Sequence, residues 1–168
     1  MALPAWADAT TVLAYAAMPE EVETSALLHG ASTHQKTVGL PRMDGDRITF
    51  HVVAGPGSGS DLRRDTGQFG ILEPLPDAIQ WEPNPAERIF VVCPGLAFDL
   101  ERNRLGRGKG YYDRFLSGLR GVNRTTVGVC FDVQLYEQVP AGPEDRRMDM
   151  VVTETRLVGP GRFVESAP

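Results

Sequence analysis

A glycine-rich, cationic segment is the part of this chain whose residue types and spacing best suit chemistry. From Arg104 to Tyr112 the sequence is RLGRGKGYY, so three glycines alternate with Arg107 and Lys109. Glycine lets backbone N–H groups come close to a ligand and tolerates positive φ. A helix that starts directly afterwards would add unsatisfied N–H donors and a partial positive charge. These features predict a polyphosphate-binding loop, although the glycine spacing is neither that of a Walker A loop nor that of a dinucleotide fingerprint.

The charge pattern of the chain is consistent with an anionic ligand at this segment. The 168 residues carry a net charge of −5, whereas residues 102–124 contain seven cations and one anion and so carry +6. The rest of the chain is therefore at −11. A solvated cationic helix face would give the same local count. The acidic total disfavours an RNA-binding module that uses the basic stretch and its paired tyrosines, and we expect no nucleic-acid partner.

Several acidic residues could serve such a ligand or could have a simpler role. Asp113 could cap a helix, or it could help to hold Mg²⁺, which binds one or two carboxylates together with phosphate oxygens. Spacing alone is more consistent with a surface charge for Asp145. The sequence EEVE at residues 20–23 suits the first turn of a helix, where carboxylates match the helix dipole.

The elements that position these residues are predicted by hydrophobic periodicity. The segment Arg88–Cys93 is apolar without alternation, which is typical of a strand buried on both faces. Strands that alternate with helices predict an α/β fold with a largely parallel sheet. We expect strands over residues 11–16, 36–40, 47–53, 88–93, 125–130 and 148–153, a hairpin turn at 44–46, and helices over 20–29, 111–119 and 133–139.

Composition places the chain among ordinary globular proteins. Hydrophobic residues make up 42% and charged residues 23%, and the length predicts one domain over residues 1–168. Cys93 and Cys130 lie in apolar stretches, which predicts buried free thiols in a reducing compartment. The first basic residue is Lys36, and the early apolar run Val12–Met18 is too short to span a bilayer. We therefore expect a cytoplasmic protein with no membrane partner.

One run of residues strongly resembles a known family. Pro94-Gly95-x-x-Phe98-Asp99, followed by the segment from Arg104 to Asp113, resembles the 5-formyltetrahydrofolate cyclo-ligase family, also called 5,10-methenyltetrahydrofolate synthetase. Weaker matches extend the resemblance from about residue 12 to residue 155. They are Glu21-Val22-Glu23-Thr24, Leu40-Pro41, Phe69-Gly70-Ile71-Leu72-Glu73-Pro74, Phe131 with Gln134, Val139-Pro140, and Asp145 with Asp149 before Val151-Val152-Thr153.

The resemblance implies a fold, a reaction and its cofactors. The fold would be a three-layer α/β/α sandwich similar to those of sugar-phosphate isomerases and CoA transferases. The reaction would use ATP and Mg²⁺ to close 5-formyltetrahydrofolate into 5,10-methenyltetrahydrofolate, with release of ADP and phosphate. In the chemistry proposed for the family, the γ-phosphoryl group is placed on the formyl oxygen, N10 attacks the activated carbon, and phosphate leaves. The alternative is a non-catalytic relative that binds nucleotide or folate without turnover. We expect a monomer.

The resemblance also implies roles for individual residues of this chain. Asp113 and Asp145 would serve Mg²⁺, and Arg107, Lys109 and Tyr112 would be catalytic. Glu21 would bind the folate pterin, with Ala16 and Tyr111 completing the substrate site. The ATP-binding residues would be Arg104, Leu105, Gly106, Arg107, Gly108, Lys109, Gly110, Tyr111 and Tyr112.

This chain departs from the family pattern at two places. Family members begin with a long helix that carries a Lys and an Arg in contact with ATP, and this sequence begins about where that helix should have ended. We therefore expect weak ATP binding. The family also commonly has a glycine two residues before the position of Arg104, where this chain has Arg102. This substitution predicts an altered turn, from which Arg102 could reach toward the phosphates in place of the missing cations.

Overall fold

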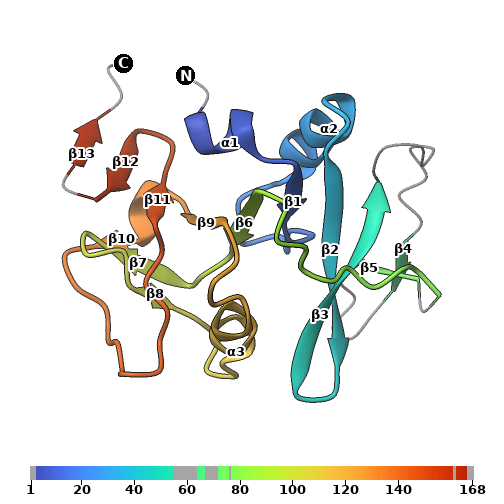
Figure 1. Ribbon diagram of the computed structural model, residues 1–168. Coiled ribbons are helices and arrows are strands. Elements are labelled where there is room, and N and C mark those ends of the chain that lie inside the picture. The colour runs from blue at the N-terminus through green and yellow to red at the C-terminus, as the bar shows by residue number, and fades with distance from the viewer. Residues whose placement is uncertain (1–2, 55–63, 67–71, 76, 161, 166–168) are drawn as a thin grey trace.

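The computed structural model describes residues 3–54, 64–66, 72–75, 77–160 and 162–165 and is built around one mixed sheet (Figure 1). Eight strands form it, in the order β13-β12-β11-β9-β6-β1-β2-β3. The five strands from β11 to β2 are all parallel to their neighbours, while β12, β13 and β3 are antiparallel additions at the two edges. The bounds are β1 Thr11–Leu13, β2 Thr37–Asp44, β3 Arg47–Ala54, β6 Ile89–Cys93, β9 Arg124–Val129, β11 Met150–Val152, β12 Arg156–Gly159 and β13 Arg162–Glu165.

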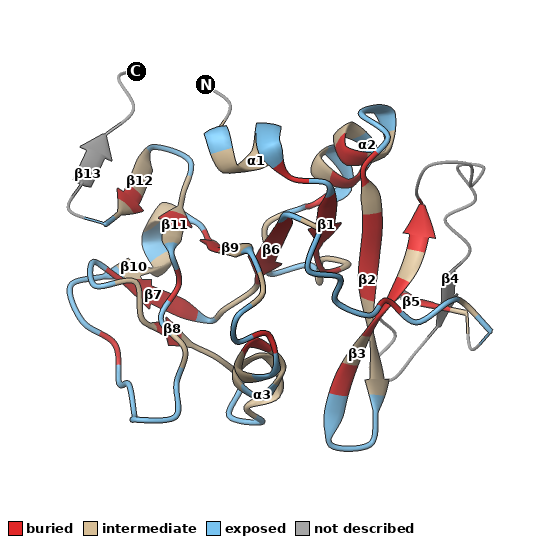
Figure 2. Ribbon diagram, in the orientation of Figure 1, coloured by how far each residue is buried: buried red, intermediate tan, exposed pale blue. Residues whose placement is uncertain are grey.

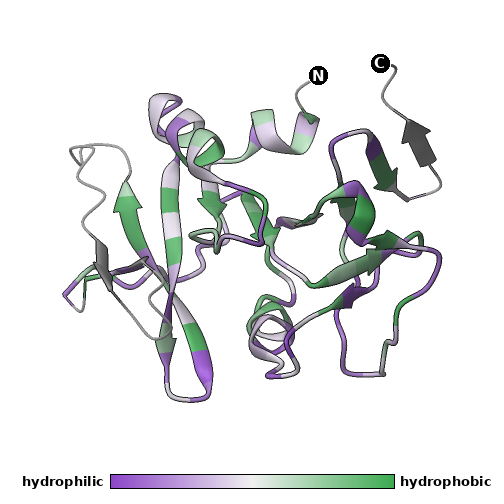
Figure 3. Ribbon diagram, turned by 180° about the vertical axis from the view of Figure 1, so that it is seen from behind, coloured by the Kyte–Doolittle hydropathy of each residue, from purple (hydrophilic) through white to green (hydrophobic). Residues whose placement is uncertain are grey.

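Helices cover both faces of the sheet and give it three layers. Alternate residues of β1 and β6 point to opposite faces, so Val12 and Phe90 join one core and Leu13 and Val91 the other. The first core includes residues of α1 (Pro4–Asp8) and α2 (Ser25–Thr33), and the second includes Leu116 of α3 (Tyr111–Gly118). The central strands β1 and β6 are buried along their whole length (Figure 2), and apolar residues concentrate on the central strands when the molecule is seen from behind (Figure 3). The α/β fold and the mostly parallel sheet are thus confirmed.

Two smaller sheets flank the main one. Strands β10 (Leu135–Tyr136), β7 (Ala97–Asp99) and β8 (Arg104–Leu105) form a three-stranded sheet, and β4 (Arg64–Thr66) pairs with β5 (Leu72–Pro74). The predicted helix over residues 133–139 is wrong, because a three-residue 3₁₀ helix, Asp132–Gln134, leads directly into β10. The amide of Gln134 donates to the Leu96 carbonyl at 3.1 Å, and Leu135 pairs with Phe98. These long-range partners favour an extended backbone over a helix.

The predicted helix over residues 20–29 begins later than expected. Helix α2 starts at Ser25, so residues 20–23 lie in the turn and loop before it. The reason is local hydrogen bonding: the Tyr15 hydroxyl donates to the Val22 carbonyl at 2.9 Å, and the buried Thr24 hydroxyl donates to the Tyr15 carbonyl at 2.6 Å. The acidic residues are therefore held in a loop after β1 and do not serve the helix dipole.

Strand β2 also continues beyond Pro41, where the sequence predicted its end. Pro41 pairs with Phe50 of β3, and the parallel pairing of β2 with β1 reaches only Gly39. Proline cannot donate a hydrogen bond within a sheet, but at this point β1 has ended and needs no donor from β2. The predicted hairpin is confirmed, with β2 and β3 joined at residues 44–47.

Within the part of the chain that the structure describes, no helix has the length and apolar character needed to cross a bilayer.

Candidate active site

The segments that carry the predicted site residues meet at one edge of the sheet. The carboxyl ends of parallel strands lie on the same edge, where open α/β sheets bind ligands. Residues 14–24 follow β1, and residues 94–110 follow β6, its neighbour in the sheet. An ion pair joins the two segments, because the Arg107 guanidinium lies 2.6 Å from Oε1 of Glu20. The structure therefore brings together the acidic loop and the glycine-rich loop, which are 87 residues apart in sequence.

Glu21 is half-buried and held in a defined position. The Met18 backbone N–H donates to Oε2 of Glu21 at 3.1 Å, and the Glu21 N–H donates back to the Met18 carbonyl at 2.9 Å. Burial raises the pKa of the Glu21 carboxyl above its usual value. Ala16 is half-buried in the same stretch, directly after Tyr15, whose hydroxyl fixes Val22. Glu21 is thus a fixed, partly desolvated hydrogen-bond acceptor, and Tyr15 holds the backbone beside it, a role that the sequence did not suggest.

The glycine-rich loop is open to a ligand. Gly108 and Gly110 have φ of +80° and +63°, a conformation that strains other residues, and Gly110 is the N-cap of α3. A Cβ at Gly108 would meet no atom of the described residues within 4 Å. Lys109 between them is exposed, and its ammonium group has no hydrogen bond or ion pair with any residue described in the structure. Leu105 and Gly106, just before, are half-buried and connect the loop to β8. An exposed cation on a glycine-shaped backbone at a helix start suits a phosphate.

Arg104 has a different environment from Arg107 and Lys109. Its side chain is only 6% exposed, and its guanidinium forms an ion pair with Oδ2 of Asp113 at 2.8 Å. It also donates to the Pro94 carbonyl at 3.4 Å. The other oxygen of Asp113 accepts the backbone N–H of Arg146 at 3.0 Å. Arg104 and Asp113 therefore join β8, the start of α3 and the loop before β11, so each has a clear internal role.

The two residues expected to serve Mg²⁺ lie on segments that meet here. Arg146, which contacts Asp113, follows directly after Asp145. Asp145 is exposed, and its Oδ2 accepts the Gly142 N–H at 2.6 Å. Among the described residues there is no group of three or more His, Cys, Asp or Glu side chains that could hold a metal ion. An ion here would depend on phosphate oxygens and water for most of its ligands, as Mg²⁺ usually does.

The adjacent side chains of Tyr111 and Tyr112 lie in different surroundings. The Tyr112 hydroxyl is buried and lacks a hydrogen-bond partner among the residues that the structure describes, and burial raises its pKa well above the usual value. The Arg104 guanidinium lies 5.4 Å from the Tyr112 ring centroid, and the Phe50 ring packs edge-on at 6.5 Å. Tyr111 instead lies under Arg114, at 5.4 Å. A buried hydroxyl without a partner is costly, so Tyr112 is a candidate for direct contact with a ligand.

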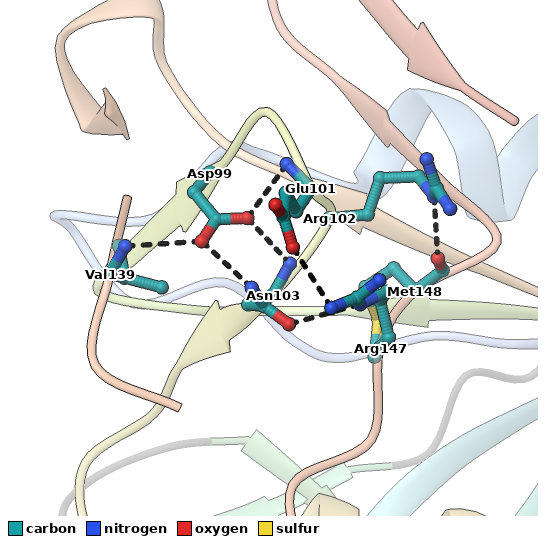
Figure 4. A network of polar contacts seen from close by, with 7 residues as sticks. All are labelled: Asp99, Glu101, Arg102, Asn103, Val139, Arg147 and Met148. Carbon is teal, nitrogen blue, oxygen red and sulfur yellow. Dashed lines mark hydrogen bonds and ion pairs between the residues drawn. The ribbon is translucent and has the colours of Figure 1, made fainter. Parts of the chain in front are cut away.

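A buried carboxylate next to the loop also carries a role that the sequence did not suggest. Asp99 is fully buried, and its oxygens accept the backbone N–H groups of Glu101, Asn103 and Val139 at 3.0, 2.8 and 3.1 Å (Figure 4). The Asn103 amide donates to it as well, at 2.9 Å. Asp99 therefore fixes the turn between β7 and β8, which delivers Arg104. Asp99 belongs to the Pro94-Gly95-x-x-Phe98-Asp99 motif, but the sequence did not predict its hydrogen-bond partners.

Arg102 occupies this turn and does not face the glycine-rich loop. Its φ is +69°, so it adopts the conformation that a glycine would take without strain. Its guanidinium donates to the carbonyls of Met148 and Gly159 at 3.2 and 3.3 Å (Figure 4 shows the first bond). The expectation that Arg102 reaches toward the phosphates is therefore wrong in this structure, because its side chain holds the turn against Met148 and Gly159.

Comparisons with known proteins match most of the chain to one family. The family model described as the 5-formyltetrahydrofolate cyclo-ligase family matches residues 1–154. The chain is 28% identical over 169 residues to a probable 5-formyltetrahydrofolate cyclo-ligase of Schizosaccharomyces pombe, covering 93% of this chain and 80% of that protein. It is 31% identical over 150 residues to the 5-formyltetrahydrofolate cyclo-ligase of Mycolicibacterium smegmatis, covering 87% and 74%.

Solved structures give the same result. The NMR structure of the 5,10-methenyltetrahydrofolate synthetase of Aquifex aeolicus superposes with a TM-score of 0.74 at 33% identity, covering 97% of this chain and 79% of that one. A 5,10-methenyltetrahydrofolate synthetase of Mycoplasma pneumoniae superposes with a TM-score of 0.62 at 21% identity, covering 85% and 72%, and supports the fold alone.

Proposed function

The chain belongs to the 5-formyltetrahydrofolate cyclo-ligase family, and we propose that it uses ATP and Mg²⁺ to convert 5-formyltetrahydrofolate into 5,10-methenyltetrahydrofolate, with release of ADP and phosphate. The observation that carries this proposal is the contact between Arg107 and Glu20. It brings a hydrogen-bond acceptor suited to a pterin, Glu21, beside a loop suited to a triphosphate. The reaction needs both at one place, because a phosphoryl group must pass from the nucleotide to the folate.

The pterin end of the substrate is assigned to the loop after β1. The pterin ring presents amino and ring N–H donors, and the half-buried Glu21 carboxylate is an acceptor of fixed position. Ala16 offers a small, half-buried side chain in the same stretch. A hydrogen bond to a charged acceptor in a partly desolvated site is stronger than one in water. These properties support Glu21 as the group that orients the folate.

The phosphates are assigned to the glycine-rich loop. Lys109 is exposed and unpaired among the described residues, and the positive φ of Gly108 and Gly110 turns the backbone around it. Arg107 can also reach a phosphate once it leaves Glu20. Such groups stabilise the charge that develops on the transferred phosphoryl group. The buried Arg104 positions this loop through Asp113 and Pro94, and Tyr112 offers nearby a hydroxyl that has no hydrogen-bond partner among the described residues.

The residues present fit Mg²⁺ in part. Asp145 is exposed, and Oδ2 is the one oxygen for which a contact among the described residues is found, so its carboxylate can bind an ion with phosphate oxygens and water. Asp113 uses both oxygens on Arg104 and Arg146, so it would act through the position of the loop unless those bonds break. When bound, Mg²⁺ would neutralise part of the charge on the phosphates.

The chemistry follows from the weakness of the formyl oxygen as a leaving group. Transfer of the γ-phosphoryl group to that oxygen releases ADP and makes the formyl carbon electrophilic. Attack by N10 then forms the new C–N bond, N10 gives up its proton to solvent or to the departing phosphate, and inorganic phosphate leaves with the former formyl oxygen. The contribution of this chain is to hold the two substrates in line and to stabilise charge.

The proposal is tested by mixing the protein with 5-formyltetrahydrofolate and MgATP and following the near-ultraviolet absorbance of the methenyl product. We expect product in proportion to ADP, and none when ATP or Mg²⁺ is omitted. Absence of product while ATP still raises the thermal stability of the protein would instead support a relative that binds without turnover. Absence of both product and ATP binding would overturn the proposal.

A further inference from the structure

The loop that follows β1 is closed on itself by two side-chain hydroxyl groups. The Tyr15 hydroxyl crosses the loop and donates to the Val22 carbonyl at 2.9 Å, and the Thr24 hydroxyl donates back to the Tyr15 carbonyl at 2.6 Å. Tyr15 and Thr24 are each only 3% exposed. Neither bond is part of the backbone pairing of a helix or a strand, so these two hydroxyls hold residues 15–24 as one closed unit at the carboxyl end of β1.

Thr24 serves this closure and not the helix that it precedes. It is the N-cap residue of α2, a position where the hydroxyl of a threonine commonly accepts a backbone N–H of the first helical turn. In this chain the Thr24 side chain makes no capping bond, and its backbone has φ of −108° and ψ of −1° instead of the extended conformation usual for an N-cap. The stability of α2 therefore does not explain why the hydroxyl lies where it does.

The closed loop leaves one oxygen of Glu21 available. Oε2 of Glu21 accepts the Met18 N–H at 3.1 Å, whereas Oε1 has no hydrogen bond or ion pair with any residue that the structure describes. The carbonyl that the Tyr15 hydroxyl holds belongs to Val22, the next residue in the chain. The bond from Tyr15 thus limits how far the backbone of Glu21, and with it the free oxygen, can move.

Electrostatic effects indicate that this loop lies close to the rest of the site. Burial raises the pKa of Tyr15, and the Glu21 carboxylate raises it further, so the hydroxyl keeps the proton that it donates to Val22. Burial is also the main cause of the raised pKa of Tyr112, and Glu21 adds to it. The charge of Glu21 therefore acts both on the group that closes the loop and on the first turn of α3.

We propose that Tyr15 and Thr24 are positioning residues for the folate: by closing the loop they hold the free oxygen of Glu21 where the pterin needs it, without touching the substrate themselves. This inference rests on the proposed function. A preorganised acceptor binds more tightly, because less conformational freedom is lost when the ligand binds. If the two hydroxyls served only the stability of the fold, their removal would lower the melting temperature and leave folate affinity unchanged.

The test uses matched substitutions in the full chain. Tyr15→Phe and Thr24→Val each remove one closing hydroxyl, Thr24→Ser keeps it, and Tyr136→Phe removes the hydroxyl of a tyrosine on β10 that is 54% exposed. Calorimetric titration with 5-formyltetrahydrofolate should give about fivefold weaker binding for the first two variants, since one neutral hydrogen bond is worth roughly that factor. Thr24→Ser and Tyr136→Phe should bind like the wild type.

A further variant separates positioning from a general loss of stability. The buried Thr126 hydroxyl donates to Oδ2 of Asp149 at 2.9 Å and accepts the Asp149 N–H at 3.0 Å, so it joins β9 to the residue before β11. Thr126→Val should lower the melting temperature at least as much as Tyr15→Phe does, with no change in folate affinity. An equal loss of folate affinity in Thr126→Val would overturn the inference.

Kinetics complete the test. KM for 5-formyltetrahydrofolate should rise in Tyr15→Phe and Thr24→Val by the same factor as the dissociation constant, with kcat and KM for ATP unchanged, as expected when binding is lost equally in the ground and transition states. Unchanged folate affinity in both variants would overturn the inference and leave the proposed function intact. If Tyr15→Phe does not fold, the contrast between Thr24→Val and Thr24→Ser decides.

The wild type provides the reference that distinguishes the two proposals. Folate binding without turnover would refute the proposed function, while the pattern of affinities among the variants would still support the positioning role. A wild type that binds no 5-formyltetrahydrofolate at all would overturn both.

Discussion

At the scale of single residues, cations that are close in sequence have different tasks. Arg104 is buried against Asp113, Arg107 is paired with Glu20, and Lys109 is exposed without a partner among the described residues. The sequence grouped all three as phosphate ligands, because alternation with glycine reports which residues lie near a ligand and not which of them are already paired. Of these three cations, Lys109 therefore contributes least to the stability of the fold and has the most direct role in the proposed reaction.

Lys109→Ala should weaken ATP binding or slow turnover at least tenfold, which corresponds to about 1.4 kcal/mol. The melting temperature should hardly change, because an exposed loop lysine removes no core packing. Steady-state kinetics with varied ATP, together with thermal unfolding, measure both effects. Unchanged kinetics, or a marked loss of stability, would contradict a phosphate role.

Glu21→Gln should raise KM for 5-formyltetrahydrofolate, because an acceptor oxygen is replaced by a donor of similar shape. The same substitution should not lower the melting temperature, although it weakens substrate binding. Burial raises the pKa of Glu21 in the folded protein, so its ionisation disfavours folding, and stability is lost as pH rises through the unfolded and folded pKa values. The variant should therefore melt at the same temperature as the wild type or higher at pH 7, and the difference should vanish in acid.

Glu20→Gln provides the comparison for that variant. It releases Arg107 and leaves the Glu21 carboxylate in place. It should therefore change KM for ATP and leave KM for 5-formyltetrahydrofolate unchanged. If both substitutions raised the folate KM equally, Glu21 would be only one of two interchangeable charges.

At the scale of elements, the sequence predicted what local pattern determines and missed what distant partners determine. The buried strand β6 and helix α3 were predicted within a residue or two, since continuous apolar character and helical periodicity are local signals. Helix α1 was missed because five residues carry little signal of their own. It is held by distant groups: the Trp6 ring packs on Phe90 at 5.5 Å, and the Lys36 ammonium donates to the Ala7 carbonyl at 3.2 Å.

The turn between β7 and β8 allows a prediction at this scale. Arg102→Gly and Arg102→Ala both lose the guanidinium bonds to the Met148 and Gly159 carbonyls, but only glycine accepts a φ of +69° without strain. Glycine should therefore be more stable than alanine here by up to about 1 kcal/mol, after the larger unfolded-state entropy of glycine is counted. Urea denaturation measures the difference. Greater stability of the alanine variant would mean that the turn relaxes.

At the scale of the whole molecule, the sheet sets which loops can cooperate. The sequence predicted parallel strands and therefore one edge at which loops gather, and the pairing of β1 with β6 confirms this for the acidic and glycine-rich loops. The small sheet of β10, β7 and β8 could not be predicted, because its strands have only two or three residues and β10 pairs with β7 across more than thirty positions. The residues that determine the position of Arg104, such as Asp99, belong to this part of the fold.

The two thiols report on the integrity of the whole sheet. Cys93 and Cys130 are free and buried, and burial raises the pKa of each thiol to about 12. Since the thiolate is the reactive form, a disulfide reagent should modify the native protein slowly at pH 8 and the urea-unfolded protein at once. The label rate in native buffer should rise in parallel with the unfolded fraction as urea is added. Rapid labelling without urea would show that the strand ends open locally.

The ion pair between Arg107 and Glu20 has a consequence for the heat of nucleotide binding. Arg107 lowers the pKa of Glu20 while the two are in contact. If Arg107 transfers to a phosphate, Glu20 regains its ordinary affinity for protons and takes them up from an acidic buffer. Binding enthalpies measured near pH 4.5 would then differ between buffers by their heats of ionisation, and the dependence would disappear at neutral pH, where Glu20 stays ionised in both states. A proton count from calorimetry would thus record the departure of Arg107 from the acidic loop.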